Sequence, residues 1–319
     1  MLDRACTLRC KESMNRMSTE KRAQILGMMV EGASIRAICR MTGASKNTVT
    51  KLLVDAGNAF SEYQDKTLRN LKCRRVQCDE IWSFVGMKEK MPKRQGRQDD
   101  PNCGDVWTWT TIDADTKLVP SWFVGGRDAG AAYELMSDLQ GRLATRIQLT
   151  TDGHRAYLEA VESTFGMGID YAMLVKIYGE DPNDKEHRYS PAVCIGTECN
   201  VVSGNPDPDH ISTSYVQRQN LSMRMGMRRF TRLTNAFSKK VENHVHALSI
   251  YFMHYNFVRI HQTLRLTPAM EAKMIGPDGK EKAVTDHAWT LADIVTVLQE
   301  WEAHQPHAKV GRKPGQKSN

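Results

Sequence analysis

The run from Val76 to Gly86, VQCDEIWSFVG, constrains the fold of this chain more than any other stretch. Its β-branched and aromatic residues predict a strand that Gly86 ends. Asp79 and Glu80 lie in the middle of that strand. A buried carboxylate is costly unless something pairs with it, and a divalent metal is the usual partner at an active site. The acids therefore either point to solvent from an edge strand or belong to such a site.

The segments that follow predict where a second acid lies. The expected elements are a strand hairpin, an amphipathic helix, a strand and a further helix, in residues 105–126, 128–143, 146–153 and 154–165. Three strands in a meander, followed by a helix, a strand and a helix, are typical of a ribonuclease H-like mixed sheet. The sequence thus predicts a mixed α/β fold. In that fold the central acid of the first strand lies beside the terminal acid of the fourth, so Asp79 and Asp152 are expected to be neighbours.

Residues 18–58 predict an all-α helix-turn-helix domain that precedes the sheet. Ser18 or Thr19 is expected to cap the first helix, and a short second helix is expected from Ser34 to Met41. Ser45 is expected to cap the third helix, which should end at Gly57. In this geometry the first turn of the last helix faces the DNA major groove with short hydrogen-bonding groups and cations. The side chains concerned are Lys46, Asn47, Thr48, Thr50 and Lys51. The alternative is a plain three-helix bundle whose polar face is solvated.

The remaining boundaries follow from changes in pattern along the chain. We expect a flexible N-terminus, a linker, a mixed-sheet domain with an insertion of loops around short strands, and a C-terminal helix with a basic tail. These are residues 1–17, 59–72, 73–270 with the insertion at about 166–213, and 271–319. A helix is expected from Ser214, with a break near residues 226–233, and another at residues 291–304.

Composition narrows the class of partner. The formal net charge is +7, with basic residues crowded into residues 218–240 and 309–317, which favours a polyanionic partner. No run of eighteen apolar residues and no apolar signal core is present, so a cytoplasmic protein without a membrane partner is expected. The eight cysteines are expected to be reduced thiols. Cys194 and Cys199 could bind zinc with a nearby histidine, although their spacing matches no known zinc knuckle.

Four stretches carry a resemblance to a known family. They are CDEIWSFVG, TTDGHRAY, GNPDPDHISTSYVQRQNLSMRMGMRRFTRLTNAFSKKVENH and HYNFVRIHQTL, spread over most of residues 20–270. With them the chain resembles a transposase of the insertion-sequence-one family of bacterial mobile elements. Many relatives begin with a cysteine-rich zinc ribbon, of which only Cys6 and Cys10 could remain here, so no N-terminal zinc is expected.

The resemblance implies a DDE transposase on a ribonuclease H-like fold, in which two aspartates and a glutamate hold two Mg²⁺ or Mn²⁺ ions. It implies binding to double-stranded DNA, namely terminal inverted repeats and target DNA, followed by strand cleavage and strand transfer. Joining two ends requires a homodimer or a higher homo-oligomer, associated with the nucleoid. By motif, Asp79 and Asp152 are the two aspartates. Gln217 stands where the family has glutamate in its Ser-Tyr-Val-Glu-Arg-Gln-Asn run.

Gln217 is the departure that matters most. Glutamine keeps the shape of glutamate and removes only its charge. A deliberate substitution made to trap a DNA complex would have this form. Natural decay of a mobile element is the alternative explanation. We therefore expect a catalytically inactive variant that still binds DNA. A non-catalytic helix-turn-helix regulator derived from a transposase is the competing hypothesis. A stand-alone metal-dependent nuclease would explain the acids but not the helix-turn-helix.

Several further residues are candidates for supporting roles. On the helix from Ser214, Gln217, Asn220 and Arg224 share a face because they are three and seven positions apart. His154 follows the second aspartate and either contacts the scissile phosphate or caps the next helix. The arginines expected to contact DNA, or else to form a solvated basic face, are Arg218, Arg224, Arg228 and Arg229.

Overall fold

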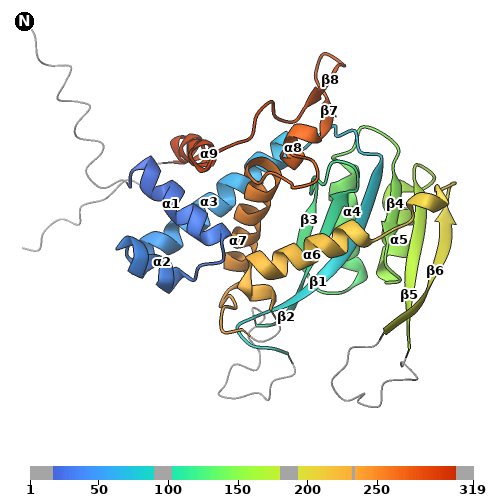
Figure 1. Ribbon diagram of the computed structural model, residues 1–319, viewed down its shortest axis with the longest axis horizontal. Helices are drawn as coiled ribbons and strands as arrows, with labels where there is room; N and C mark the ends of the chain where they lie inside the picture. The colour runs from blue at the N-terminus through green and yellow to red at the C-terminus, as the bar shows by residue number, and fades with distance from the viewer. Residues whose placement is uncertain (1–16, 90–102, 180–192, 232–233, 307–319) are drawn as a thin grey trace, which may run out of the picture.

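The computed structural model describes residues 17–89, 103–179, 193–231 and 234–306 (Figure 1). The sequence predictions for residues 1–16 and for the basic tail from residue 307 lie outside these ranges. Among the described residues, no helix is both long and apolar enough to cross a membrane.

A six-stranded mixed sheet forms the centre of the molecule. Its strands are β1 (Arg75–Val85), β2 (Gly104–Asp113), β3 (Trp122–Gly125), β4 (Gln148–Thr151), β5 (Asp170–Gly179) and β6 (Val193–Ser203). The order across the sheet is β3-β2-β1-β4-β5-β6. The β1–β2, β2–β3 and β5–β6 pairs are antiparallel, and the β1–β4 and β4–β5 pairs are parallel. The first five strands have the order of a ribonuclease H-like sheet, which confirms the predicted fold class.

Helices cover both faces of this sheet. The helices α4 (Ala129–Gln140) and α5 (Ala156–Phe165) pack together on one face, and α6 (Ser214–Gly226) crosses β1 and β2 on the other (Figure 1). Asp128 begins α4 by accepting a hydrogen bond from the Ala131 amide at 2.9 Å. Because α6 lies against β1, polar residues on one side of this helix can reach the acids of the central strand.

Residues 166–213 differ from the expectation of loops around short strands. They contain β5 and β6, which are 10 and 11 residues long and complete the sheet. Proline, glycine and aspartate at the ends of these strands dominate the local composition. The β-branched and aromatic residues of DYAMLVKIYG nevertheless favour a strand, and parallel pairing with β4 fixes β5 in place.

Three N-terminal helices begin within one residue of their predicted starts. They are α1 (Thr19–Val30), α2 (Ile35–Thr42) and α3 (Lys46–Thr67), capped by Ser18, Ser34 and Ser45. Gly43 ends α2 with φ of 71°, a conformation that favours glycine. The helix α3 does not end at Gly57 but continues to Thr67.

Gly57 has a different role from the predicted helix end. It faces α7 (Val241–Met253), and a Cβ added there would lie 2.4 Å from the Cβ of His246. The glycine therefore permits close packing of α3 against α7. Because of this contact, the second half of α3 packs against α7 and does not connect two separate domains as an exposed linker would.

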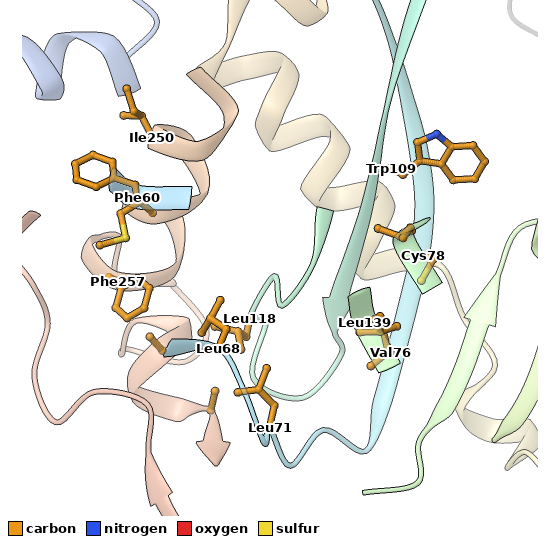
Figure 2. Packing of buried hydrophobic residues seen from close by; sticks show 14 of the residues in the cluster. Phe60, Leu68, Leu71, Val76, Cys78, Trp109, Leu118, Leu139, Ile250 and Phe257 are labelled. Carbon is orange, nitrogen blue, oxygen red and sulfur yellow. The ribbon is translucent and has the colours of Figure 1, made fainter. Parts of the chain in front are cut away.

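One buried apolar cluster runs from the N-terminal helices into the sheet (Figure 2). Phe60 on α3 and Phe257 lie at one end of it, and Val76 and Trp109 on the sheet lie at the other. The helix α9 (Leu291–His304) packs on α1 and α3, and Glu302 forms a salt bridge with Arg22 at 2.9 Å. The remaining elements are η1 (Pro208–His210), η2 (Arg228–Phe230), η3 (His254–Val258), α8 (Pro268–Glu271), β7 (Lys273–Ile275) and β8 (Glu281–Ala283).

Candidate metal centre

Three carboxylates meet at the end of β4. Asp79, Glu80 and Asp152 each place one carboxylate oxygen within 4.8 Å of the others. The register explains why: β4 ends at Thr151, opposite Cys78, so the next two residues of β1 have no β4 neighbour. Asp152 comes directly after the end of β4, where both side chains can reach it. The structure thus brings together the two aspartates that the sequence predicts to be neighbours.

Asp79 is held by two donors on the α6 side of the sheet. Its Oδ1 accepts a hydrogen bond from the Glu80 amide at 2.9 Å, and its Oδ2 accepts one from Asn220 Nδ2 at 2.9 Å. Asn220 is 5% exposed, and its Oδ1 has no hydrogen-bond partner among the described residues. A buried amide oxygen without a donor is costly, and a cation beside Asp79 would satisfy it.

Glu80 enters the cluster from the opposite face of β1, where it is almost fully buried. Its Oε1 accepts hydrogen bonds from Arg127, with the Nε contact at 2.7 Å, and its Oε2 accepts one from the Tyr157 hydroxyl at 3.3 Å. The Arg127 guanidinium also lies 4.7 Å from the centre of the Trp107 ring. The arginine offsets one of the three negative charges and fixes the direction of the Glu80 carboxylate.

The carboxylates of the cluster repel one another and are poorly solvated. Burial, together with the charges of Asp152 and Glu80, raises the pKa of Asp79 from 3.8 to about 7. Burial and the charge of Asp152 likewise raise the pKa of Glu80, despite the opposing effect of Arg127. The raised pKa values of Asp79 and Glu80 mean that their ionised forms are disfavoured. A bound cation would remove this cost by supplying the positive charge that the site lacks.

Asp152 and His154 form a turn before α5. Asp152 Oδ1 accepts a hydrogen bond from the His154 amide at 3.0 Å. The His154 ring stacks on Trp109 with 5.7 Å between ring centroids, and its Nε2 is buried without a partner among the described residues. It does not cap α5, whose N-cap is Arg155. Of the two roles that the sequence leaves open for His154, the capping role is therefore wrong.

Gln217 lies one helical turn from Asn220 on α6. Its Oε1 accepts a hydrogen bond from Lys176 Nζ at 2.6 Å, and its Nε2 donates one to Thr213 Oγ1 at 3.1 Å. The amide is therefore bonded to a lysine from β5 and is not one of the three carboxylate-bearing residues of the cluster. Its role as a metal ligand stays a prediction.

The three carboxylates and Asn220 Oδ1 fit a divalent cation. Mg²⁺ and Mn²⁺ prefer oxygen ligands, and carboxylates that repel each other at close range are stabilised by such an ion. The raised pKa of Asp79 and the unpartnered Asn220 oxygen point to the same missing charge. In the part of the chain that the structure describes, no other group of three or more histidine, cysteine, aspartate or glutamate side chains meets this geometry. Cys194 and Cys199 therefore have no described zinc partners.

The residues predicted to contact DNA lie mostly at the surface. Lys46, Asn47 and Lys51 are exposed on the first turns of α3, whereas Thr48 bonds to Ser45 and Thr50 is half-buried. Of the predicted arginines, three are exposed and one is half-buried: Arg218, Arg224 and Arg228 in the first group and Arg229 in the second. This placement is compatible with nucleic-acid contacts, which stay a prediction.

Sequence reasoning missed Glu80, Arg127 and Tyr157 as parts of this site. Neighbouring strand residues normally point to opposite faces, so strand periodicity alone does not bring the Glu80 carboxylate beside that of Asp79. The signal that could have found it is the shortness of β4, because a strand that ends at Thr151 opens a gap beside Asp79 and Glu80.

No protein-family model matches the sequence, and neither does any curated protein. Solved structures similar to the chain include a piggyBac transposase synaptic complex with hairpin DNA, at 10% identity and a TM-score of 0.36, covering 96% of this chain and 78% of that one. The Mos1 strand transfer complex is similar at 14% identity and a TM-score of 0.22, covering 50% and 60%. The Mos1 mariner paired-end complex with Mn is similar at 10% identity and a TM-score of 0.26, covering 76% and 78%.

Proposed function

We propose that this chain is a DNA transposase of the insertion-sequence-one type, whose third catalytic carboxylate is replaced by Gln217. The observation that carries the proposal is the meeting of Asp79, Glu80 and Asp152 at the end of β4 in a ribonuclease H-like sheet. The substrate is double-stranded DNA with terminal inverted repeats, and the reaction is strand cleavage followed by strand transfer.

The residues of the centre divide the work between holding metal and fixing geometry. Asp79, Glu80 and Asp152 would hold the divalent cation, and Asn220 Oδ1 is placed to support it. At such a site a bound Mg²⁺ or Mn²⁺ ion supplies activation of the attacking hydroxyl and stabilisation of the leaving oxygen. Arg127 directs the Glu80 carboxylate, so its contribution is orientation and not proton transfer.

Gln217 weakens the position of a second ion for two reasons. An amide carries no negative charge, and Lys176 Nζ already donates to its oxygen at 2.6 Å. A cation beside an uncharged ligand repels a metal ion. We expect a loss of about a hundredfold or more in strand cleavage relative to a glutamate at this position, by analogy with the removal of one electrostatic catalytic group.

DNA binding does not depend on that carboxylate. In this proposal the first turn of α3, on which Lys46, Asn47 and Lys51 are exposed, enters the major groove as the second helix of a helix-turn-helix. Exposed arginines on α6 and after it add phosphate contacts. Two DNA ends require two active sites, so the working form is a homodimer or a higher homo-oligomer.

A second candidate is a non-catalytic DNA-binding regulator derived from a transposase. The specific observation in its favour is the Lys176–Gln217–Thr213 chain of hydrogen bonds, which satisfies the amide without any metal. In this function Asp79, Glu80 and Asp152 would be remnants of the ancestral transposase. Strand cleavage would then not return in Gln217→Glu.

The test compares this chain with Gln217→Glu in Mn²⁺ on DNA that carries the repeats flanking its own gene. We expect Gln217→Glu to cut and join the ends, and the present chain to bind them with little cutting. Gln217→Glu combined with Asp152→Asn is the matched control and should not cut. If Gln217→Glu binds the repeats but does not cut them, the regulator is favoured and the catalytic proposal is contradicted. Equal cutting by both chains would place the third carboxylate elsewhere.

A further inference from the structure

A cavity of about 720 Å³ lies away from the metal centre, where the N-terminal helices meet the segment between α6 and α7. One wall comes from the turn between α1 and α2 and from the start of α3. The other wall comes from residues 227–229 and from the approach to α7, residues 235–240. Gly32 brings the walls together: with φ of 77°, it packs so closely that an added Cβ would lie 2.7 Å from the Gly226 carbonyl oxygen.

The charge of the cavity is of one sign. Its lining includes six cationic side chains: Arg36, Lys46, Arg228, Arg229, Lys239 and Lys240. None of the described residues that line it is acidic, and none of these six cations forms a salt bridge with a described carboxylate. Like charges gathered in a partly enclosed space repel one another, and a bound anion removes that cost.

Arg229 shows the missing counter-charge most clearly. Its Nη1 donates to the neutral Ser238 hydroxyl at 2.8 Å. Burial lowers the pKa of Arg229 to about 10, and no described carboxylate opposes that effect. Burial, together with the charge of Arg229, also lowers the pKa of His244 to about 3, so the neighbouring ring is neutral.

The start of α7 adds backbone donors at the same place. Lys240 is its N-cap, and no side chain caps the first turn. The amides of a helix N-terminus point outward and favour negative charge. Lys239, Lys240 and Asn243 line the cavity, so these amides lie beside the cationic side chains.

We propose that this cavity binds a phosphodiester group of the DNA on which the first turn of α3 lies. Lys46 belongs both to that turn and to the cavity, which makes the two contacts continuous. The bound phosphate is then held from one side by the N-terminal helices and from the other by the segment that leads from α6 to α7. A single DNA phosphate would thereby connect the DNA-binding helix α3 to the segment that follows α6, the helix on which Asn220 and Gln217 lie. This inference rests on the DNA-binding part of the proposed function.

The experiment measures binding to a random duplex of about 20 base pairs by fluorescence anisotropy over a series of salt concentrations. The variant is Lys239→Ala with Lys240→Ala, two exposed side chains whose removal leaves the core intact. Lys280→Ala is the matched control, an exposed lysine at the β7–β8 turn outside the cavity lining. Lys51→Ala removes a cation of α3 that does not line the cavity. Circular dichroism checks that all variants fold.

Each phosphate contact contributes about 0.9 to the slope of log K against log salt. Losing the cavity phosphate should therefore lower the slope of the double variant by about one and weaken binding about tenfold at about 0.1 M salt. Lys280→Ala should match the parent chain. If the double variant keeps the parent slope while Lys51→Ala lowers it, DNA binding stands and the cavity inference is overturned. A parent chain that does not bind duplex overturns both.

A second arm separates DNA from a free phosphate ester. The melting temperature is measured with inorganic phosphate and with adenosine monophosphate. Weak or absent stabilisation, together with the altered DNA slope, supports the duplex as the source of the phosphate. Strong stabilisation of the parent chain but not of the double variant, with an unchanged DNA slope, would show a free phosphate ester as the ligand and overturn the DNA assignment.

Discussion

Asp79→Asn should make the metal-free protein more stable at about pH 8. The ionised carboxylate is disfavoured because it is buried beside Asp152 and Glu80, and its pKa rises from 3.8 to about 7. Each pH unit of that difference corresponds to about 1.36 kcal/mol, so ionising Asp79 in the folded protein costs on the order of 4 kcal/mol. Because the side chain is half-buried and water screens part of the repulsion, we expect a gain of about 2 kcal/mol.

The hydrogen bonds of the site favour the same outcome. The substituted side chain keeps an oxygen that can accept from the Glu80 amide, and its new NH2 group replaces the oxygen to which Asn220 Nδ2 donates. A flip of the Asn220 amide then lets Asn220 Oδ1, which has no described partner, accept from this NH2 group. The substitution therefore removes a repelled charge and exchanges one hydrogen bond with Asn220 for another.

The sign of the pH dependence is part of the prediction. A carboxyl whose pKa is raised in the folded state contributes stability that is fully present below its unfolded value of about 3.8 and is lost as pH rises through about 7. The parent chain should therefore lose free energy of unfolding between about pH 4 and pH 7 relative to Asp79→Asn. The two should be similar near pH 4.

The assay is urea unfolding in EDTA at about pH 5 and pH 8, followed by circular dichroism. Asp209→Asn, at an exposed aspartate, is the control and should change stability little at either pH. If Asp79→Asn is less stable than the parent chain at pH 8 in EDTA, the carboxylates are not in electrostatic conflict. The reasoning that assigns a missing cation to the site would then be refuted.

Three further substitutions test helix packing and ion pairs in the fold. Gly57→Ala should cost about 1–2 kcal/mol in urea unfolding, because a Cβ 2.4 Å from α7 outweighs the gain of up to about 1 kcal/mol in helix propensity; equal or higher stability would contradict this packing. Arg127→Ala should lower the free energy of unfolding by about 1–2 kcal/mol at pH 8 and by less at pH 5, where Glu80 accepts a proton more readily. A loss that does not depend on pH would count against the ion pair. Arg146 holds the pKa of Asp170 at about 2, so Arg146→Ala should lower the free energy of unfolding by under about 1 kcal/mol at pH 7. This difference should shrink as pH falls from about 3.8 toward 2, and a difference that grows in acid would refute the pairing.

Local signals predicted the positions of the N-terminal helices and of the central acids. Ser18, Ser34 and Ser45 cap the helices that follow them because a short hydroxyl side chain can satisfy the free amides of a first turn. The strand around Asp79 and the acid at the end of β4 were also predictable, because strand order alone brings their backbones together.

Long-range contacts decided what local signals could not. The helix α3 continues past Gly57 because α7 packs against that glycine, and the partner lies almost 200 residues later in the chain, at His246. Glu80 joins the acids because of where β4 ends, and Lys176 reaches Gln217 because β5 is a sheet strand and not a loop. These features depend on register and packing, which single-residue propensities do not contain.

Binding of Mn²⁺ tests the central claim, that Asp79, Glu80 and Asp152 form a metal centre. Titration of the metal-free chain with Mn²⁺, followed by electron paramagnetic resonance of the free ion, gives the affinity without any need for DNA or activity. We predict saturable binding by the parent chain and by Asp209→Asn, and binding weakened by about a hundredfold in Asp152→Asn, since a charged oxygen ligand is replaced by a neutral amide. Equal Mn²⁺ affinity in the parent chain and Asp152→Asn would contradict the account.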